Sequence, residues 1–409
     1  MFLAKTNNGK LKKIRFFSTL PKNLINISIA SYFWSFSTLI IASILPIYMS
    51  EVLGASGVEI GILEGVAVSF SYFIRLFAGI TSDYFRNRKV LIAIGSAFNV
   101  FTKILFALSG SVLSIFIARS LDRIVKGFRS SPTDAFIADI SEKGKEASSF
   151  GFKQSVYTFG AVSGTIAAWY ACQCSISYNM IFSISIIPAV TAFLIVQFGL
   201  TQPKIKKEIN SRKVRLHWRD FSHFSSQFFI LILFSSLLML ARFSTFFISI
   251  HARDLGCKVS NIPFIIVLFC LGSAIIAYPA GKLADKIGRY KLILFALFFL
   301  LSANTIFIST NSILSVFIGS ILFGAHFGII QGSLVSLISS SVQSDLRGSA
   351  YAIYYFTGGM ALFLGNTNAG YLCDKFGTTG PFLGGLVISL VIMIFFIIFF
   401  YKKIFVNKI

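Results

Sequence analysis

Ionisable side chains recur at helical spacing inside an apolar part of the chain, residues 113–139. Asp122 and Arg123 lie three and four residues after Arg119 and four and three before Lys126, which places all four on one face of a helix. Each charge costs at least about 2.5 kcal/mol to insert at the centre of a bilayer, so this face is predicted to border a bundle interior or a watery cavity. The chemistry open to it is ion pairing, proton transfer and the binding of a charged molecule.

Further charges lie within other apolar stretches. Glu64 and Lys103 occur in the second and third predicted spans, and Arg242 occurs in the seventh. Glu64 and Asp122 are carboxylates deep within the first half of the chain, and a buried carboxylate whose surroundings change can take up and release a proton. Two hypotheses stay open: these carboxylates bind protons, or they form static ion pairs with Arg that hold helices together. Tyr157, in the fifth predicted span, is a further candidate for the same cavity.

The composition places these charges in a membrane protein. Hydrophobic residues make up 55% and charged residues 13% of the 409 residues, and the mean hydropathy is +0.79, whereas soluble domains are about a quarter charged. The apolar runs accommodate roughly twelve helices of about 20 residues. A closed β-barrel is disfavoured because runs such as 383–401 are apolar on every side instead of alternating. We therefore predict an all-α membrane protein with twelve transmembrane helices.

The net charge of +22 does not indicate a nucleic-acid partner, because of where the basic residues lie. Most of the 37 Lys and Arg fall in the tail before residue 25 and in alternate loops, whereas the other loops contain only Arg253, Lys258 and Lys375. This asymmetry follows the positive-inside rule and predicts that both termini are cytoplasmic. Contact with anionic lipids accounts for the basic excess, so the expected partners are the bilayer and a small molecule, without nucleic acid.

A polar, basic segment divides the chain into two halves of six spans each. The five Cys show no metal-ligand spacing, so no metal site is expected. The predicted organisation is a basic cytoplasmic tail at 1–24, an N-terminal six-helix half at 25–200, a cytoplasmic linker at 201–224, a C-terminal six-helix half at 225–401 and a cytoplasmic tail at 402–409.

One short pattern occurs once in each half. Both copies end an apolar span with Gly, place Asp four residues later, and add basic residues before the next span. Both lie between the second and third spans of their half. This arrangement indicates internal duplication, a feature of transporters whose substrate site lies between the halves near mid-membrane. The residues of the two copies are Gly79, Asp83, Arg88, Lys89, Gly281, Asp285, Lys286, Gly288, Arg289 and Lys291.

Over nearly its whole length the chain resembles the major facilitator superfamily of secondary transporters. Most positions of the second copy match the family's loop signature, G-x-x-x-D-[RK]-x-G-x-[RK]-[RK], whereas Tyr84 and Arg86 depart from it in the first. The resemblance implies two pseudo-symmetric halves and a cytoplasmic gate, in which Asp83 and Asp285 each face the positive end of a helix from the other half. The alternative is that these charges only fix the topology.

Two further motifs carry the resemblance. Arg123-x-x-x-Gly127 is similar to a family motif of the fourth span whose Arg is linked to proton coupling, and DRIVKGFRSSPTDAFIAD resembles one bacterial branch of the family. Gly160-x-x-x-Gly164 resembles an exporter signature of proton antiporters, but Thr165 stands in place of its Pro. Close helix packing through the small residues Gly127, Gly160 and Gly164 is the alternative interpretation.

The expected function is secondary active transport of a small molecule by alternating access, with the proton gradient as energy source and no cofactor. The first hypothesis is export of a drug, siderophore or metabolite by proton antiport. The second is proton-coupled uptake of an organic anion or nutrient, and the third is a transport-inactive receptor or scaffold. The excess of buried cations favours an anionic or zwitterionic substrate. We expect a monomer in a bacterial inner membrane. We do not expect an enzyme, because the loops contain no paired nucleophile and base, metal cluster or phosphate loop.

Overall fold

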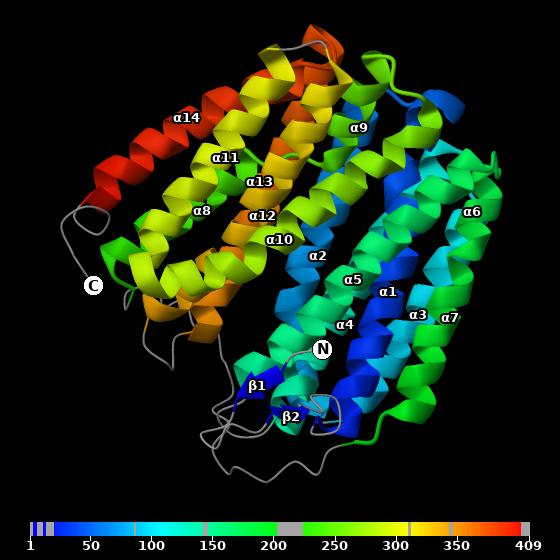
Figure 1. The fold of residues 1–409 in the computed structure, drawn as a ribbon, viewed down its shortest axis with the longest axis vertical. Coiled ribbons are helices and arrows are strands. Elements are labelled where there is room, and N and C mark those ends of the chain that lie inside the picture. The colour runs from blue at the N-terminus through cyan, green and yellow to red at the C-terminus, as the bar shows by residue number, and fades with distance from the viewer. Residues whose placement is uncertain are drawn as a thin grey trace.

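The computed structural model describes residues 3–5, 11–13, 20–85, 87–141, 146–202, 224–309, 312–342 and 347–401. Most of this part of the chain is helical and forms two six-helix halves that lie side by side (Figure 1). Two short strands, β1 (Leu3–Lys5) and β2 (Leu11–Lys13), pair antiparallel in the N-terminal tail, which the sequence analysis did not predict.

The helices of the two halves follow one another in matching order. The first half contains α1 (Lys22–Ile47) with the π-helical turn η2 (Tyr48–Val52), α2 (Gly57–Phe85), α3 (Arg88–Ala107), α4 (Val112–Ile140), α5 (Glu146–Gln173), α6 (Tyr178–Ile184), α7 (Ile186–Leu194) and η3 (Ile195–Gly199). The second half contains α8 (Ser226–Leu240), α9 (Thr245–Asp254), η5 (Val259–Asn261), α10 (Ile262–Ile287), α11 (Arg289–Ser309), α12 (Ile313–Ser340), α13 (Arg347–Phe376) and α14 (Gly380–Tyr401).

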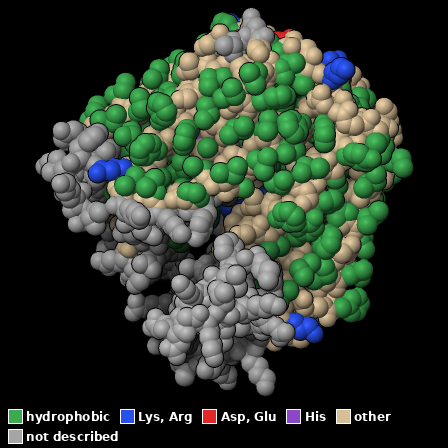
Figure 2. Space-filling view, in the orientation of Figure 1, with side chains coloured by type: hydrophobic (Ala, Val, Ile, Leu, Met, Phe, Trp, Pro, Cys, Tyr) green, Lys and Arg blue, Asp and Glu red, His purple; other side chains and the backbone are tan. Residues whose placement is uncertain are grey.

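The outer surface of the bundle suits a lipid environment. In the described part of the chain, nine helical stretches are long and apolar enough to cross a membrane. The helices α4, α5 and α13 complete the predicted twelve, and they are less apolar because they carry charged or small polar residues. Figure 2 shows one face covered with hydrophobic side chains and with few charged ones. The predicted fold class, an all-α membrane protein with twelve spans, is confirmed.

The seventh span is broken, whereas the sequence predicted one continuous helix there. The helix α8 ends at Leu240 and α9 starts at Thr245, and the residues between them do not continue the helix. Ser244 starts α9 as its cap, since its hydroxyl accepts a hydrogen bond from the Phe246 amide at 3.3 Å. The amide of Ser244 donates to Asn366 Oδ1 at 2.8 Å instead of to a carbonyl of its own helix. A side-chain bond from α13 and the cap formed by Ser244 therefore satisfy backbone groups at the break.

The two halves make their closest helix contact between α2 and α13. Gly57, Gly61 and Gly65 line one side of α2 at intervals of four and face α13. A Cβ added to Gly61 would lie 2.5 Å from the Asn366 carbonyl oxygen, so only glycine allows this approach. This contact lies toward the end of the bundle that carries the predicted outer loops, which we call the outer end. In Figure 1 the halves meet at the top and separate toward the bottom.

Replacing Gly61 by Ala is expected to destabilise the α2–α13 contact by about 1 to 3 kcal/mol, because the added methyl forces two backbones apart. The measurement is thermal unfolding of the purified protein. Gly151 in α5 is the matched control, since a Cβ there meets nothing within 4 Å and Ala is the better helix former. Equal stability of the two variants would contradict the close approach.

Candidate functional site

A buried ion pair joins α2 and α4 in the first half. Glu64 Oε1 accepts a hydrogen bond from Arg119 Nε at 2.7 Å, and the two side chains are 3% and 2% exposed. Arg123 lies one turn further along α4 and within electrostatic range of the same carboxylate. The spacing of three and four residues predicted this shared face, but it did not identify the partner of Glu64.

The second oxygen of Glu64 reaches the other half of the protein. Ser244 Oγ, at the break between α8 and α9, donates to Glu64 Oε2 at 3.1 Å. Asn366 of α13 is buried and holds the Ser244 amide. Glu64 is therefore bonded to both halves at once. The sequence analysis missed Ser244, because a single Ser in an apolar span carries no pattern that marks a helix break.

A second buried ion pair lies inside the first half. Lys103 Nζ of α3 and Asp122 Oδ1 of α4 are 2.6 Å apart, and the side chains are 1% and 2% exposed. Asn99 and Thr102 also donate to Asp122 Oδ1, at 3.4 and 3.3 Å. Three groups of the same half thus bond this carboxylate, whereas Glu64 lies at the interface of the halves. The two carboxylates, equivalent in the sequence, are in different environments in the structure.

Several cations near these pairs have no carboxylate within 4 Å in the described part of the chain. Arg123, Lys126 and Arg242 are partly exposed, and Lys126 and Arg242 contact aromatic rings instead. Lys126 Nζ lies 5.9 Å from the ring centre of Tyr157, and the Arg242 guanidinium lies 4.4 Å from that of Phe327. Each half therefore contributes a cation that contacts an aromatic ring, Lys126 with Tyr157 of α5 and Arg242 with Phe327 of α12.

Two buried polar side chains extend the cationic region toward the inner end of α1. The Arg129 guanidinium stacks on the Trp34 ring at 3.8 Å. Its Nη1 and the Trp34 Nε1 are both buried without a hydrogen-bond partner among the described residues. Arg129 thus contacts a ring, and no carboxylate pairs with it within 4 Å in the described part of the chain.

The repeated loop motif is described in part. Arg88 is the first residue of α3, and it pairs with Asp139 at the end of α4 and donates to the Ala135 carbonyl at 2.5 Å. Gly288 has φ +86°, a left-handed conformation that explains the glycine of the second copy. Lys89 and Lys291 lie at the starts of α3 and α11. The side-chain environments of Gly79, Asp83, Gly281, Asp285 and Lys286 lie outside the described residues, so the gate itself stays a prediction.

Polar contacts between the halves gather at the outer end. Asp374, at the end of α13, accepts hydrogen bonds from the amides of Gly57 and Val58 at 2.7 and 3.0 Å. These amides start α2, where a carboxylate is favoured by the unpaired N–H groups and the helix dipole. Arg253 pairs with Glu51 in the same region, with Nη2 at 3.3 Å from Oε2. The outer end is therefore closed by two carboxylates that the sequence analysis did not select.

Replacing Asp374 by Ala is expected to shift the protein away from this outer-closed arrangement about fivefold, because a lost helix cap costs about 1 kcal/mol. Distance measurements between labels on the outer ends of α2 and α13 would detect the shift as a longer separation. Glu59→Ala is the control, since Glu59 bonds Ser56 of its own half and, in the described part of the chain, no residue of the other half. An unchanged distance distribution for the Asp374 variant would contradict this role.

The predicted small-residue positions all lie against other helices of the first half. A Cβ on Gly127 would lie 2.8 Å from the Ser71 carbonyl of α2, and one on Gly164 would lie 2.5 Å from the Phe36 carbonyl of α1. Gly160 faces the Tyr32 carbonyl of α1 in the same way. The geometry of Gly160 and Gly164 thus matches the packing interpretation of this motif.

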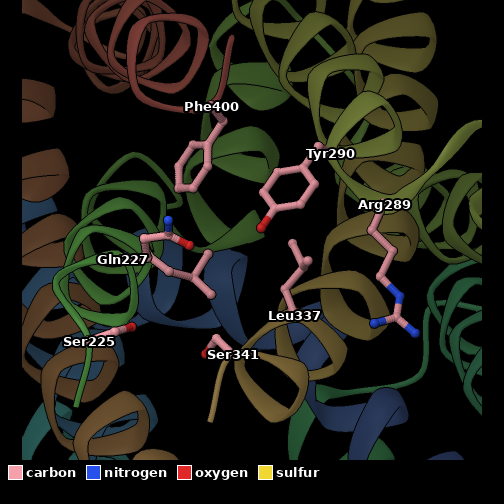
Figure 3. Close-up of a pocket in the computed structure, with 8 residues that line it drawn as sticks. Ser225, Gln227, Arg289, Tyr290, Leu337, Ser341 and Phe400 are labelled. Carbon is pink, nitrogen blue, oxygen red and sulfur yellow. The ribbon is translucent and has the colours of Figure 1, made fainter. Parts of the chain in front are cut away.

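A separate cavity of about 420 Å³ lies within the second half, between the ends of α8, α11, α12 and α14 (Figure 3). Gln227 and Tyr290 reach toward each other across it. Arg289, which the sequence analysis placed in the gate, is one of its lining residues. The cavity is formed by one half alone and includes no residue of α2 or α4, so it is distinct from the charged site.

Two six-helix halves of matching order, with charged side chains where they meet, form an arrangement typical of membrane transporters. The model of the Major Facilitator Superfamily matches residues 26–258 and 240–408. The chain belongs to this superfamily, and the resemblance found in the sequence is confirmed.

Relatives of the chain include proteins of archaea and bacteria. An uncharacterized MFS-type transporter of Methanocaldococcus jannaschii is 28% identical over 91% of this chain and 93% of its own length. The quinolone resistance protein NorA of Staphylococcus aureus is 22% identical over 86% of this chain and 92% of its own length. These matches span both halves.

Solved structures share the fold at low sequence identity. The nucleoside transporter NupG superimposes with a TM-score of 0.75 at 16% identity, covering 94% of this chain and 99% of its own. The D-xylose-proton symporter gives 0.71 at 15% identity, covering 91% and 96%. The human organic anion transporter MFSD10 gives 0.66 at 16% identity, covering 92% and 99%.

Proposed function

We propose that this transporter exports a small organic anion or zwitterion in exchange for protons. The observation that carries the proposal is the surplus of positive charge around the interface of the halves. Arg123 and Lys126 of one half and Arg242 of the other are partly exposed and have no carboxylate within 4 Å among the described residues. A negatively charged group bound between the halves would compensate these cations in a region of low dielectric.

Aromatic rings beside these cations favour an organic substrate over a simple inorganic ion. Tyr157 accompanies Lys126, Phe327 accompanies Arg242, and Tyr72 reaches Met239 next to Arg242. Rings and cations together suit a molecule with an apolar body and one acidic group. The similarity to the quinolone resistance protein of S. aureus supports export.

Proton coupling is proposed to involve Glu64, because this carboxylate bonds both halves and is shielded from water. Asp122 is proposed to be the static partner of Lys103, since three groups of one half bond it. A second candidate function is proton-coupled uptake of an organic anion, favoured by the likeness of the fold to the D-xylose-proton symporter.

We place the protein in the cytoplasmic membrane with both termini in the cytoplasm, as the positive-inside rule predicts.

The test is flux in vesicles that contain the purified protein. A thermal-shift screen with drugs, organic acids and nutrients first selects compounds that bind, and labelled binders are then followed with and without an imposed pH gradient. Export by antiport predicts movement of the compound against the direction of the proton, and symport predicts movement with it. Flux that ignores the gradient would reject proton coupling, and stabilisation by cations alone would reject an anionic substrate.

A further inference from the structure

We propose that Ser244 and Asn366 form, with Glu64, an inter-half clamp that closes the outer end when Glu64 is ionised and loosens when it is protonated. This inference rests on the proton coupling proposed above and assigns the residues that convert a protonation into movement of the halves. The clamp is defined by two hydrogen bonds, Ser244 Oγ to Glu64 Oε2 at 3.1 Å and Ser244 N to Asn366 Oδ1 at 2.8 Å.

The break in the seventh span gives the clamp its geometry. Since Ser244 is the cap of α9, both its hydroxyl and its amide point away from a regular helix, toward α2 and α13. The carboxylate of Glu64 therefore lies at the N-terminus of α9, a helix of 10 residues. An ionised carboxylate is stabilised there by the hydrogen bond and by the helix dipole, and a neutral one much less.

The charges around Glu64 set the direction of the response. Among the described residues, Arg119 and Arg123 of α4 are the charged groups within reach of this carboxylate. The nearby Asp122 is paired with Lys103, and α13 contributes the neutral Asn366. When Glu64 is ionised, Arg119 and Ser244 both hold it. When Glu64 takes up a proton, the ion pair with Arg119 and the charge-assisted hydrogen bond to Ser244 both weaken. The contact between α2 and α9 is then less stable.

The clamp couples the protonation of Glu64 to the positions of α9 and α13 relative to α2. The clamped state closes the outer end and contains ionised Glu64, and protonation of Glu64 favours the unclamped state. Two contacts of α2 with the second half would be lost together as α13 and α9 move away from α2. They are the packing of Gly61 against Asn366 and the hydrogen bond between Ser244 and Glu64.

A native thiol reports on the clamp. Cys373 lies against Gly57 at the outer end of α2 and α13, whereas Cys174 is exposed. The full-length protein in nanodiscs is labelled with a maleimide between pH 5.5 and 8, and peptide mass spectrometry quantifies both thiols. The ratio of Cys373 to Cys174 labelling removes the effect of pH on thiol reactivity. In the wild type we expect this ratio to rise as the pH falls.

Variants of Ser244 distinguish its hydrogen bond to Glu64 from its role as the cap of α9. Ser244→Ala is expected to raise the ratio at pH 8 by roughly tenfold, the effect of one hydrogen bond to a charged group, and to flatten its pH dependence. Ser244→Asp keeps a good cap but places a second negative charge against Glu64, so we expect an increase at least as large. Ser244→Thr retains the hydroxyl and is expected to behave like the wild type. Ser249→Ala is the matched control, because the Ser249 hydroxyl donates to the Thr245 carbonyl of its own helix and to no other described residue.

Two results would overturn the clamp. The clamp would be rejected if the labelling ratio of Ser244→Ala matched that of the wild type at every pH. If substrate flux of the wild type nevertheless followed the pH gradient, the proposed proton-coupled transport would stand without the clamp. A low ratio for Ser244→Asp would also reject the clamp, because it would show that capping alone keeps the outer end closed. If flux of the wild type ignored the gradient as well, the proposed coupling would fail together with the clamp.

Discussion

Replacing Glu64 by Gln is expected to abolish substrate movement driven by a pH gradient while leaving exchange of substrate across the membrane intact. Gln keeps the size and the hydrogen-bond acceptor of Glu64 but cannot carry the charge that Arg119 and Ser244 hold. The loss should be complete within the sensitivity of the flux assay, because no proton can be bound at this position. The measurement compares gradient-driven flux with counterflow in vesicles of the same preparation.

The control for this prediction is Glu59→Gln in the first turn of the same helix. Glu59 accepts hydrogen bonds from Ser56 at the exposed start of α2 and touches no charged group of the site. Both kinds of flux should remain normal in that variant. If gradient-driven flux survived in Glu64→Gln, the pair with Arg119 would be a static element of the fold and the coupling carboxylate would have to be sought elsewhere.

Breaking the pair of Lys103 and Asp122 is expected to cost about 3 to 5 kcal/mol of the free energy of unfolding. Replacing Lys103 by Met leaves the carboxylate of Asp122 charged and without its ammonium partner at a site where both side chains are almost fully buried. Replacing Asp122 by Leu in addition should restore most of the stability, since no uncompensated charge then remains. Thermal or denaturant unfolding of the purified protein measures both variants.

A solvent-accessible pair supplies the matched control. Lys153 Nζ and Asp134 Oδ1 are 3.4 Å apart, and the side chains are 19% and 51% exposed. Replacing Lys153 by Met should therefore change stability by less than about 1 kcal/mol. If Lys103→Met were as mild, or if the double variant were less stable than the single one, the pair would not have the stabilising role assigned to it.

Much of the fold followed from the sequence because the bilayer restricts the choices. Long apolar runs must be helices, the distribution of Lys and Arg orients them, and two copies of one loop motif reveal the duplicated halves. The charged face of α4 was also predictable, since residues spaced by three and four share a side. Glu64, Arg119 and Arg123 are accordingly found together in the structure.

The partners of these charges could not be predicted, because pairing depends on which helices lie side by side. Asp122 and Glu64 looked alike in the sequence, yet α3 supplies Lys103 to one and the second half supplies Ser244 to the other. The hydrogen bonds of Asp374 to the amides at the start of α2 could not be predicted for the same reason. Asp374 and Gly57 are 317 positions apart, and nothing local marks them as neighbours.

The sequence by itself determined a twelve-span helical membrane protein with charge buried in its first half, because the cost of placing polar groups in lipid leaves few alternatives. The loop motif repeated in each half, and the resemblance it carries, indicated a transporter. The tertiary structure alone decided which carboxylate joins the halves. That choice depends on the break between α8 and α9, where Ser244 turns its hydroxyl toward Glu64 and Asn366 takes its amide. A helix break stabilised by neighbouring helices leaves no local signature, since the bonds that hold it come from residues distant in the chain.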